Sequence, residues 1–413
     1  MENRYDKYKD SGIAWIGEIP EHWEVRRLKH LGKNYNGLTY SPNDICGSED
    51  GILVLRSSNI KDNKLCFDDN VYVKKEIPQK LIVNKGDILI CSRNGSAELI
   101  GKAAFIELQM VATFGAFMMI FKGTSNIYHK YLFYIVTSCI SQYKWLFTTA
   151  TINQLTSSML GEIFAPFINN NLEQKSIATY LDKKCGEIDE LITLQEEMIT
   201  KLQSYKQSVI TEAVTKGLDK NVPLKDSGIE WIGKIPEHWK VVKIKYLAKI
   251  KSGDSISSNE IIQEGIYEVY GGNGLMGYCN KKNVDGFNII IGRVGALCGN
   301  VRLISESKYI TDNALILNCF DNALYPYMYI MLKAANLNNL NTSNAQPLIT
   351  GSKVLNVSLP IPPLSEQQSI TDYLDQKCSE IDELISIKQQ KIEKLKDYKK
   401  SLIFECVTGK RKV

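Results

Sequence analysis

Two histidines that recur in the same tripeptide are the first candidates for chemistry in this 413-residue chain. The sequence Glu-His-Trp occurs twice, with its histidines at His22 and His238. A histidine that binds a metal needs further ligands around the ion, and neither histidine has a nearby second ligand. The ten cysteines include no Cys-x-x-Cys pair, which indicates neither a zinc cluster nor a disulfide framework. We therefore expect both histidines to be structural, and we expect no metal site.

A glycine-rich segment is the second candidate. Residues 272–277 read GNGLMG, which matches the dinucleotide-binding pattern GxGxxG. Phosphate binding also requires a helix to begin at the end of the loop, so that the helix N-terminus meets the phosphate. Here the chain continues as YCNKKNVDGFNIII, which predicts a turn and another strand. The chain also contains no GxxxxGK[ST] loop and no Asn-Pro-Pro-aromatic loop of adenine methyltransferases. We expect no cofactor and no catalytic residue in this chain.

Two arginines lie where a predicted strand ends. Residues 92–95 (SRNG) follow the strand DILIC, and residues 292–295 (GRVG) follow NIII. An arginine between small residues can present its guanidinium fork to a phosphate or to guanine without crowding. The alternative is a β-turn with a surface arginine. Because an arginine follows a strand in both halves of the chain, we favour a function for Arg93 and Arg293.

Polar loops and glutamines extend the candidate binding surface. The loops RSSN at 56–59 and YGGN at 270–273 can hydrogen-bond bases or phosphates, or can be structural turns. Two glutamines near the ends of the same regions suit the recognition of adenine. The predicted DNA contacts are Arg56, Ser57, Asn59, Arg93, Asn94, Gln154, Tyr270, Asn273, Arg293 and Gln346.

The elements that must position these side chains occur twice. Residues 9–23 (KDSGIAWIGEIPEHW) return as 225–239 (KDSGIEWIGKIPEHW), with thirteen of fifteen positions identical. A second pair of similar segments, SIATYLDKKCGEIDELI at 176–192 and SITDYLDQKCSEIDELI at 369–385, follows later in each half. The order along the chain is motif, variable region and helical repeat, then the same again, which predicts a pseudo-two-fold internal repeat.

The helical repeats predict two long helices that pair with each other. Apolar residues recur at the a and d positions of heptads, without proline and with Gly186 as the one glycine. Each helix should extend over about 43 residues and 65 Å. The second helix must return the chain, so we expect an antiparallel pair, with the C-terminal VTGKRKV near the start of the chain. The predicted pairing residues are Leu181, Ile188, Leu191, Gln195, Leu202, Leu374, Ile381, Leu384, Lys388 and Leu395.

Two of these pairing positions are polar. Gln195 and Lys388 occupy equivalent a positions near the midpoints of their helices, and an antiparallel pair should bring them together. Buried polar residues at a positions fix the register at some cost in stability. The alternative is that both side chains reach solvent.

The variable regions have short strand-like runs followed by a helical stretch, which predicts one α+β fold in both. The expected fold class is α+β, with two α+β domains joined by two long antiparallel coiled-coil helices. The predicted domains are residues 1–171, 172–217, 218–363 and 364–413.

Composition and charge narrow the class of protein. Hydrophobic residues make up 44% and charged residues 23% of the chain, as in ordinary soluble proteins. No run of 18 apolar residues and no signal peptide are present, so we expect a cytoplasmic protein that does not enter membranes. The net charge is +4, and the helical repeats are acidic on balance. The positive excess therefore lies in the variable regions, which favours a polyanionic partner; ordinary solvated lysines are the alternative.

These motifs resemble those of the specificity subunits of type I restriction-modification systems. The resemblance covers nearly the whole chain, and rests on the doubled GIxWIGxIPEHW motif, the doubled helix EQxxIxxYLDxKxxEIDELI, and the segments PIPPLSEQQ, YGGNG and GRVGALCGN. It implies a non-catalytic subunit with two target recognition domains that bind double-stranded DNA. It also implies two methyltransferase subunits docked on the helices and ATP-dependent restriction subunits, with S-adenosylmethionine, ATP and magnesium bound by these partners.

Two unlike domains should read two unlike half-sites separated by a gap. The expected function is the recognition of a bipartite, asymmetric DNA site, which directs adenine methylation and ATP-dependent cleavage by the partner subunits. Two alternatives remain: a coiled-coil scaffold without DNA sequence preference, and an enzyme that binds a nucleotide or methyl donor through the glycine-rich segment.

Overall fold

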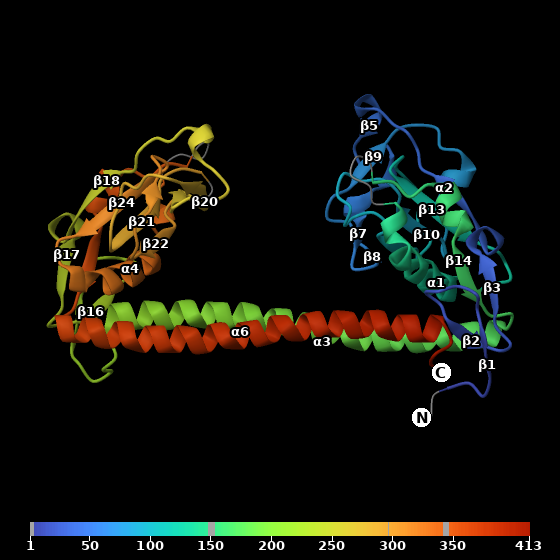
Figure 1. Cartoon of the computed structure of the whole chain (residues 1–413). Coiled ribbons are helices and arrows are strands. Elements are labelled where there is room, and N and C mark those ends of the chain that lie inside the picture. Colours follow the sequence, from blue (N-terminus) through green and yellow to red (C-terminus); the bar gives the residue numbers. More distant parts are fainter. Residues whose placement is uncertain (1–3, 148–152, 296, 342–346) are drawn as a thin grey trace. The chain divides into compact units, whose positions relative to one another are not determined.

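The computed structural model describes residues 4–147, 153–295, 297–341 and 347–413. The chain forms two compact units, one made of residues up to 194 together with 391–413, and the other of residues 195–390. Each unit contains one globular part and half of each of two long helices (Figure 1).

The globular part of the first unit contains two four-stranded sheets. The central sheet is antiparallel, in the order β11 (Ala103–Phe105), β10 (Ile88–Cys91), β13 (Met118–Gly123) and β4 (Gly32–Asn36). The second sheet has the order β12 (Ala112–Phe114), β6 (Ile52–Leu55), β9 (Val71–Val73) and β5 (Ile45–Cys46). Alternate residues of β10 face two cores: Ile88 and Ile90 pack towards helix α1 (His129–Gln142), and Leu89 and Cys91 towards the second sheet. Strand β10 is therefore buried along its whole length.

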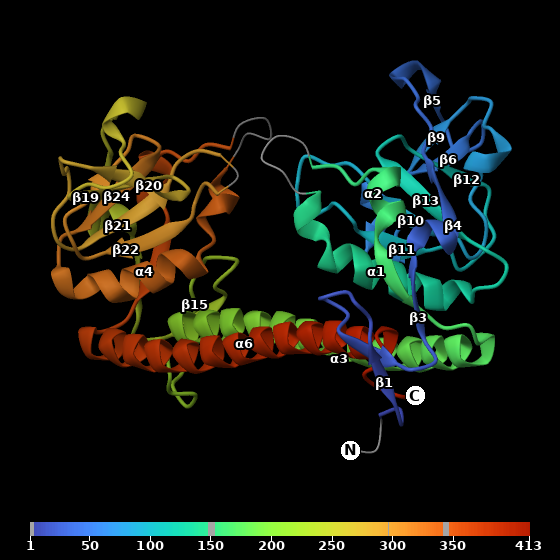
Figure 2. The ribbon, with the colours of Figure 1, turned by 45° about the vertical axis from the view of Figure 1, so that its right-hand side comes forward.

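The globular part of the second unit repeats this arrangement. Its antiparallel sheet has the order β22 (Val301–Ile304), β21 (Asn288–Gly292), β24 (Ala314–Cys319) and β18 (Ala248–Ser252). Its second sheet has the order β20 (Gly274–Cys279), β19 (Tyr267–Gly271) and β23 (Tyr309–Ile310). Helix α4 (Tyr325–Ala334) holds the place of α1, and Figure 2 shows each helix beside its sheet. The two parts share one fold, which confirms the predicted α+β class and internal repeat.

Short elements border each globular part. In the first unit these are the paired strands β1 (Tyr8–Asp10) with β2 (Glu18–Pro20), β3 (Glu24–Arg27) with β14 (Phe164–Phe167), and helix α2 (Ser157–Glu162). In the second unit they are β15 (Leu224–Asp226) with β16 (Lys234–Pro236), β17 (Lys240–Lys243) with β25 (Ser358–Ile361), and helix α5 (Gly351–Leu355). The first unit also has the hairpin β7 (Ile60–Lys61) and β8 (Lys64–Leu65), where Lys64 Nζ lies 3.6 Å from Asp189 Oδ2 of a long helix.

The long helices are α3 (Asn171–Lys216) and α6 (Leu364–Val407), and they pack against each other (Figure 1). In the first unit, Lys399 Nζ of α6 donates to Asp189 Oδ1 of α3 at 2.5 Å. In the second unit, Lys206 Nζ of α3 lies 2.6 Å from Asp382 Oδ2 of α6. The start of each helix therefore meets the end of the other, which confirms the antiparallel pairing. Among the described residues, every helix is too short or too polar to span a bilayer.

The buried seam of the helix pair differs from the predicted one at the d positions. The a positions Leu181, Ile188, Leu374 and Ile381 are at most 5% exposed. At the d positions, however, Leu191 is 44% and Leu384 is 46% exposed. Their prediction as buried pairing residues is wrong, because two paired helices bury only a narrow stripe and the isoleucines one position later turn into it. Those isoleucines are Ile192, Ile199, Ile385 and Ile392, all buried or half-buried.

The polar a positions differ from each other. Gln195 is 4% exposed, and its Oε1 atom has no hydrogen-bond partner among the described residues. Lys388 is half-buried, as are Leu202 and Leu395. That Gln195 and Lys388 fix the register stays a prediction.

Candidate nucleic-acid interface

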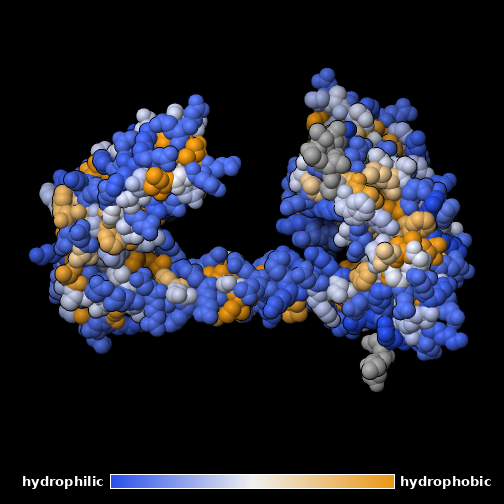
Figure 3. Space-filling view, in the orientation of Figure 1, coloured by the Kyte–Doolittle hydropathy of each residue, from blue (hydrophilic) through white to orange (hydrophobic). Residues whose placement is uncertain are grey.

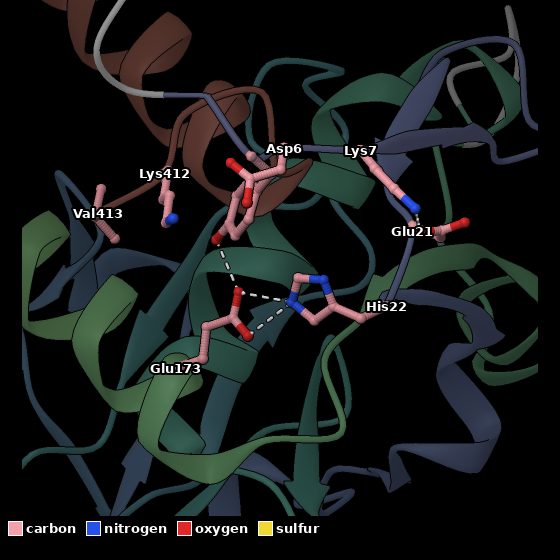
Figure 4. Close-up of a pocket in the computed structure, with 8 residues that line it drawn as sticks. Asp6, Lys7, Glu21, His22, Glu173, Lys412 and Val413 are labelled. Carbon is pink, nitrogen blue, oxygen red and sulfur yellow. Dashed lines mark hydrogen bonds and ion pairs between the residues drawn. The ribbon is translucent and has the colours of Figure 1, made fainter.

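The doubled motif attaches each globular part to the first turn of a long helix. In the first unit, Glu173 of α3 accepts hydrogen bonds from Trp23 Nε1 at 3.0 Å and from the Tyr5 hydroxyl at 2.7 Å. Its Oε2 lies 3.0 Å from His22 Nε2, as Figure 4 shows. A carboxylate in the first turn also interacts favourably with the helix dipole. Glu173 therefore holds three donors at once.

The second unit contains the same arrangement. Glu366 of α6 accepts from Trp239 Nε1 at 2.9 Å and lies 2.7 Å from His238 Nε2. Both tryptophans are completely buried. We call the contacts of Glu173 with Trp23 and His22, and those of Glu366 with Trp239 and His238, the two joints. The histidines are structural members of these joints, as the sequence predicted.

A cavity of about 520 Å³ lies beside the first joint (Figure 4). It is lined by Tyr5, Asp6, Lys7, Glu21, His22, Glu173, Lys412 and Val413. Burial, and then the hydrogen bond to Glu173, raise the pKa of Tyr5 far above its usual value, so its phenol stays protonated and donates. Among the described residues, no three His, Cys, Asp or Glu side chains are grouped to hold a metal ion. Two residues of the joint, His22 and Glu173, line this cavity.

The end of the chain packs on the first joint. The Tyr8 hydroxyl donates to the Gly409 carbonyl at 3.0 Å, and Lys410 Nζ donates to the Ile16 carbonyl at 2.6 Å. Gly409 has a φ of +73°, and a Cβ there would lie 2.2 Å from Pro20. The C-terminus therefore lies near the start of the chain, which confirms the predicted proximity (Figure 1).

In the first unit, predicted DNA contacts gather at the end of β10. Arg93 forms an antiparallel bridge with Gln154, and both side chains are exposed. The Asn94 side chain lies 3.5 Å from the Ser57 hydroxyl. The Arg93 guanidinium also lies over the ring of Phe117, 6.0 Å from its centroid, and Phe117 is 61% exposed. Sequence reasoning missed Phe117, because it begins the apolar run FMMIF and was assigned to the strand.

A hollow of about 650 Å³ lies beside Phe117 and is also lined by Tyr40, Arg56 and Ser57. Arg56 is ion-paired with Asp69 at 2.8 Å at the edge of this hollow.

Asn59 lies beneath this surface. Its side chain is fully buried, accepts from the Arg56 backbone N–H, and donates to the Cys66 and Asp69 carbonyls. The prediction that Asn59 contacts DNA is wrong, because all of its hydrogen-bonding capacity is used to shape the loop.

In the second unit, two predicted contacts lie in the β19–β20 hairpin. Asn273 is exposed at the turn, and its carbonyl accepts from Arg302 Nη2 at 3.0 Å. Tyr270 is half-buried in β19, and burial followed by the charge of Glu268 raises its pKa. Residues 272–273 form the turn between β19 and β20, and residues 274–277 belong to β20, so the helix that a dinucleotide-binding loop requires does not follow this segment. Gln346 lies outside the described residues.

Backbone hydrogen bonds correct the predicted equivalence of the two arginines. Ser92 N donates to Phe117 O, and Arg293 N donates to the equivalent Asn313 O. Leu155 N donates to Ser92 O, and Ile349 N donates to Arg293 O. Arg293 is therefore equivalent to Ser92, one position before Arg93. It is half-buried, with Nη1 3.4 Å from the Ser252 hydroxyl.

The same backbone pairing identifies the residues of the second unit that are equivalent to Arg93 and Gln154. The antiparallel bridges join Arg93 with Gln154 in the first unit and Val294 with Leu348 in the second. Val294 is thus the counterpart of Arg93, and Leu348 is the counterpart of Gln154. Local sequence does not reveal this counterpart, because it does not show where the loops between paired segments change length.

Comparison with known proteins agrees with this architecture. A family model described as the type I restriction modification DNA specificity domain matches residues 20–203 and 236–397. The chain is 30% identical to the putative type I restriction enzyme MjaX specificity subunit of Methanocaldococcus jannaschii, over 96% of each chain. It is 22% identical to the EcoKI specificity subunit of Escherichia coli K12, over 87% of this chain and 83% of that protein.

A solved structure from a study of the assembly of a type I restriction-modification system has a similar fold, with a TM-score of 0.71 at 16% identity. The superposition covers 94% of this chain and 98% of that one. Because the family model matches two segments that together make up most of the chain, and a relative at 30% identity covers 96% of it, the chain belongs to the family of type I restriction-modification specificity subunits.

Proposed function

We propose that this specificity subunit reads a bipartite, asymmetric DNA site, with one half-site for each globular part. The observation that carries the proposal is one backbone surface built twice with different side chains. At equivalent positions the first part has Arg93, and the second has Val294. Because base edges are distinguished by the groups that face them, unlike side chains on one backbone read unlike sequences.

Two exposed apolar faces on the long helices support the docking of two methyltransferase subunits. The first unit exposes Leu191 (44%) of α3 and Tyr398 (52%) of α6. The second unit exposes the equivalent Leu384 (46%) of α6 and Tyr205 (52%) of α3. Figure 3 shows hydrophobic side chains at the surface of these helices. Apolar side chains at such exposure favour a protein partner, and two equivalent faces fit two copies of one partner.

In this proposal the chain supplies sequence specificity, and partner subunits supply the chemistry. The methyltransferase subunits bind S-adenosylmethionine and modify one adenine in each half-site, after that base leaves the stack. Restriction subunits bind ATP and magnesium and cleave the DNA. The glycine-rich hairpin at 272–277 supports this division, since it lacks the helix that phosphate binding needs.

Mapping of methylated adenines in cells that express this chain with its methyltransferase tests the proposal. We expect one two-part sequence, with a methylated adenine in each half and on opposite strands. Exchange of residues 24–170 for those of another specificity subunit should change one half only. Methylation without a shared sequence would instead indicate a scaffold without DNA preference, and would refute the proposed reading.

A further inference from the structure

The exposed row Phe117, Arg93 and Gln154 has no counterpart of similar chemistry in the second unit. We propose that Arg93 reads a guanine in the half-site bound by the first globular part, with Phe117 as its positioning residue. This inference rests on the proposed function and deepens it, because it assigns one base to one side chain.

The backbone at Arg93 is paired on both sides. Its N–H donates to the Phe117 carbonyl at 3.1 Å, and on the other side it forms the bridge with Gln154. The preceding residue, Ser92, accepts from Leu155 N at 2.8 Å and follows the fully buried strand β10. A side chain that discriminates bases has to be carried by a fixed element, and Arg93 is held on both sides while its side chain is exposed.

The guanidinium of Arg93 is also available to a ligand. Arg56 is paired with Asp69, and Arg293 is half-buried beside Ser252. Within the described residues, the guanidinium of Arg93 instead lies over the Phe117 ring, 6.0 Å from the centroid. The attraction between a cation and an aromatic face does not use the hydrogen-bond donors of the guanidinium. The phenyl ring thus limits the orientations of the fork without occupying its donors.

Guanine is the base that matches such a fork. Its N7 and O6 atoms are adjacent acceptors in the major groove, and a bidentate arginine is the commonest specific contact to them. Gln154, directly across the bridge, carries an amide that fits N6 and N7 of adenine. Neighbouring strands lie about 4.8 Å apart, which is close enough for these two side chains to address adjacent base pairs.

The second unit provides a natural control on the same backbone. Its equivalents of Arg93, Phe117 and Gln154 are Val294, Asn313 and Leu348. Valine and leucine cannot donate hydrogen bonds to a base. The second globular part must therefore read its half-site with other side chains, and Arg93→Val places a residue that this fold already accepts.

The test is to map methylated sites with Arg93→Val in the complete methyltransferase complex. We expect one G·C position in one half-site to lose about 10- to 100-fold of its preference, with the other half-site unchanged. Phe117→Asn should weaken the same preference less. Arg93→Gln should move the preference at that position towards A·T, because a glutamine amide matches adenine. Val294→Ala is the matched control at the equivalent position of the second globular part, and it should leave the half-site of the first globular part unchanged.

The other possible results would overturn either the guanine assignment or the proposed function. An equal loss at all sites, with a weaker dependence on salt, would identify a phosphate contact and overturn the guanine assignment. An unchanged sequence in all Arg93 variants, or a wild-type half-site without a required G·C pair, would overturn it as well. If wild-type methylation has no bipartite sequence, the proposed function fails. If the wild-type sequence is bipartite and only the results for the Arg93 variants differ from those expected, the proposed function stands and the guanine assignment fails. Co-purification with the methyltransferase confirms that each variant complex has assembled.

Discussion

Removal of the Glu173 carboxylate tests whether the joint holds the first globular part on its helix. In Glu173→Ala, the fully buried Trp23 indole N–H loses its acceptor, which costs about 1–3 kcal/mol. The half-buried Tyr5 hydroxyl loses a hydrogen bond worth about 1 kcal/mol. His22 adds little, because its side chain is 53% exposed and water replaces the carboxylate. We expect the joint to weaken by about 2–4 kcal/mol.

Hydrogen exchange of the full chain, followed peptide by peptide, measures this loss. Since about 1.4 kcal/mol corresponds to a tenfold change, amides of β1, β2 and β3 should exchange about 30- to 1,000-fold faster. Glu366→Ala should act on β15, β16 and β17 instead, and less strongly, because Glu366 binds two donors where Glu173 binds three. Glu187→Ala removes only an exposed ion pair within α3 and should change neither region. Equal acceleration in both units, or none after Glu173→Ala, would refute the reasoning.

Three further perturbations have defined outcomes. Lys388→Leu should raise the melting temperature while loosening the helix register, because a half-buried charge at an a position becomes apolar; a lower melting temperature would contradict this. If two methyltransferase subunits dock as proposed, Leu191→Asp with Tyr398→Asp should reduce the purified complex to one copy, as read by native mass spectrometry; two retained copies would place docking elsewhere. The hydrogen bond from Lys281, followed by those from Ser257, lowers the pKa of Glu260 to about 2. A lowered folded pKa means that this stabilisation is complete above the unfolded pKa near 4.5 and is lost as pH falls towards 2. Glu260→Gln should therefore flatten the dependence of the unfolding midpoint on pH in that interval, and an unchanged slope would contradict the assignment.

The large-scale organisation was predictable because repetition and periodicity are visible without pairing information. The two copies of GIxWIGxIPEHW and the heptads predicted a doubled fold and two paired helices. The leucines at the d positions and the isoleucines that follow them are both apolar, so the heptads did not indicate that the leucines would be the exposed ones. That choice depends on how the two helices rotate against each other, which no single heptad records.

Individual contacts were less predictable, because a surface position depends on strand register and loop length. Asn59 and Ser57 lie in the same polar loop, yet Asn59 is buried and shapes the loop, whereas the Ser57 hydroxyl lies near Asn94. Arg93 and Arg293 look equivalent in sequence, and the backbone places them one residue apart. An exposed aromatic such as Phe117 is hard to recognise in the sequence, because it directly precedes the apolar residues of strand β13.

The joint also has an evolutionary consequence. Its acceptor is in the helix, its donors are in the short motif, and the side chains that differ between the globular parts take no part in it. A foreign globular part of this fold therefore has to satisfy one glutamate to be seated correctly. Recombination can therefore exchange one globular part for another of the same fold and so change one half-site. The long helices, and the faces that the protein's partners would use, stay as they are.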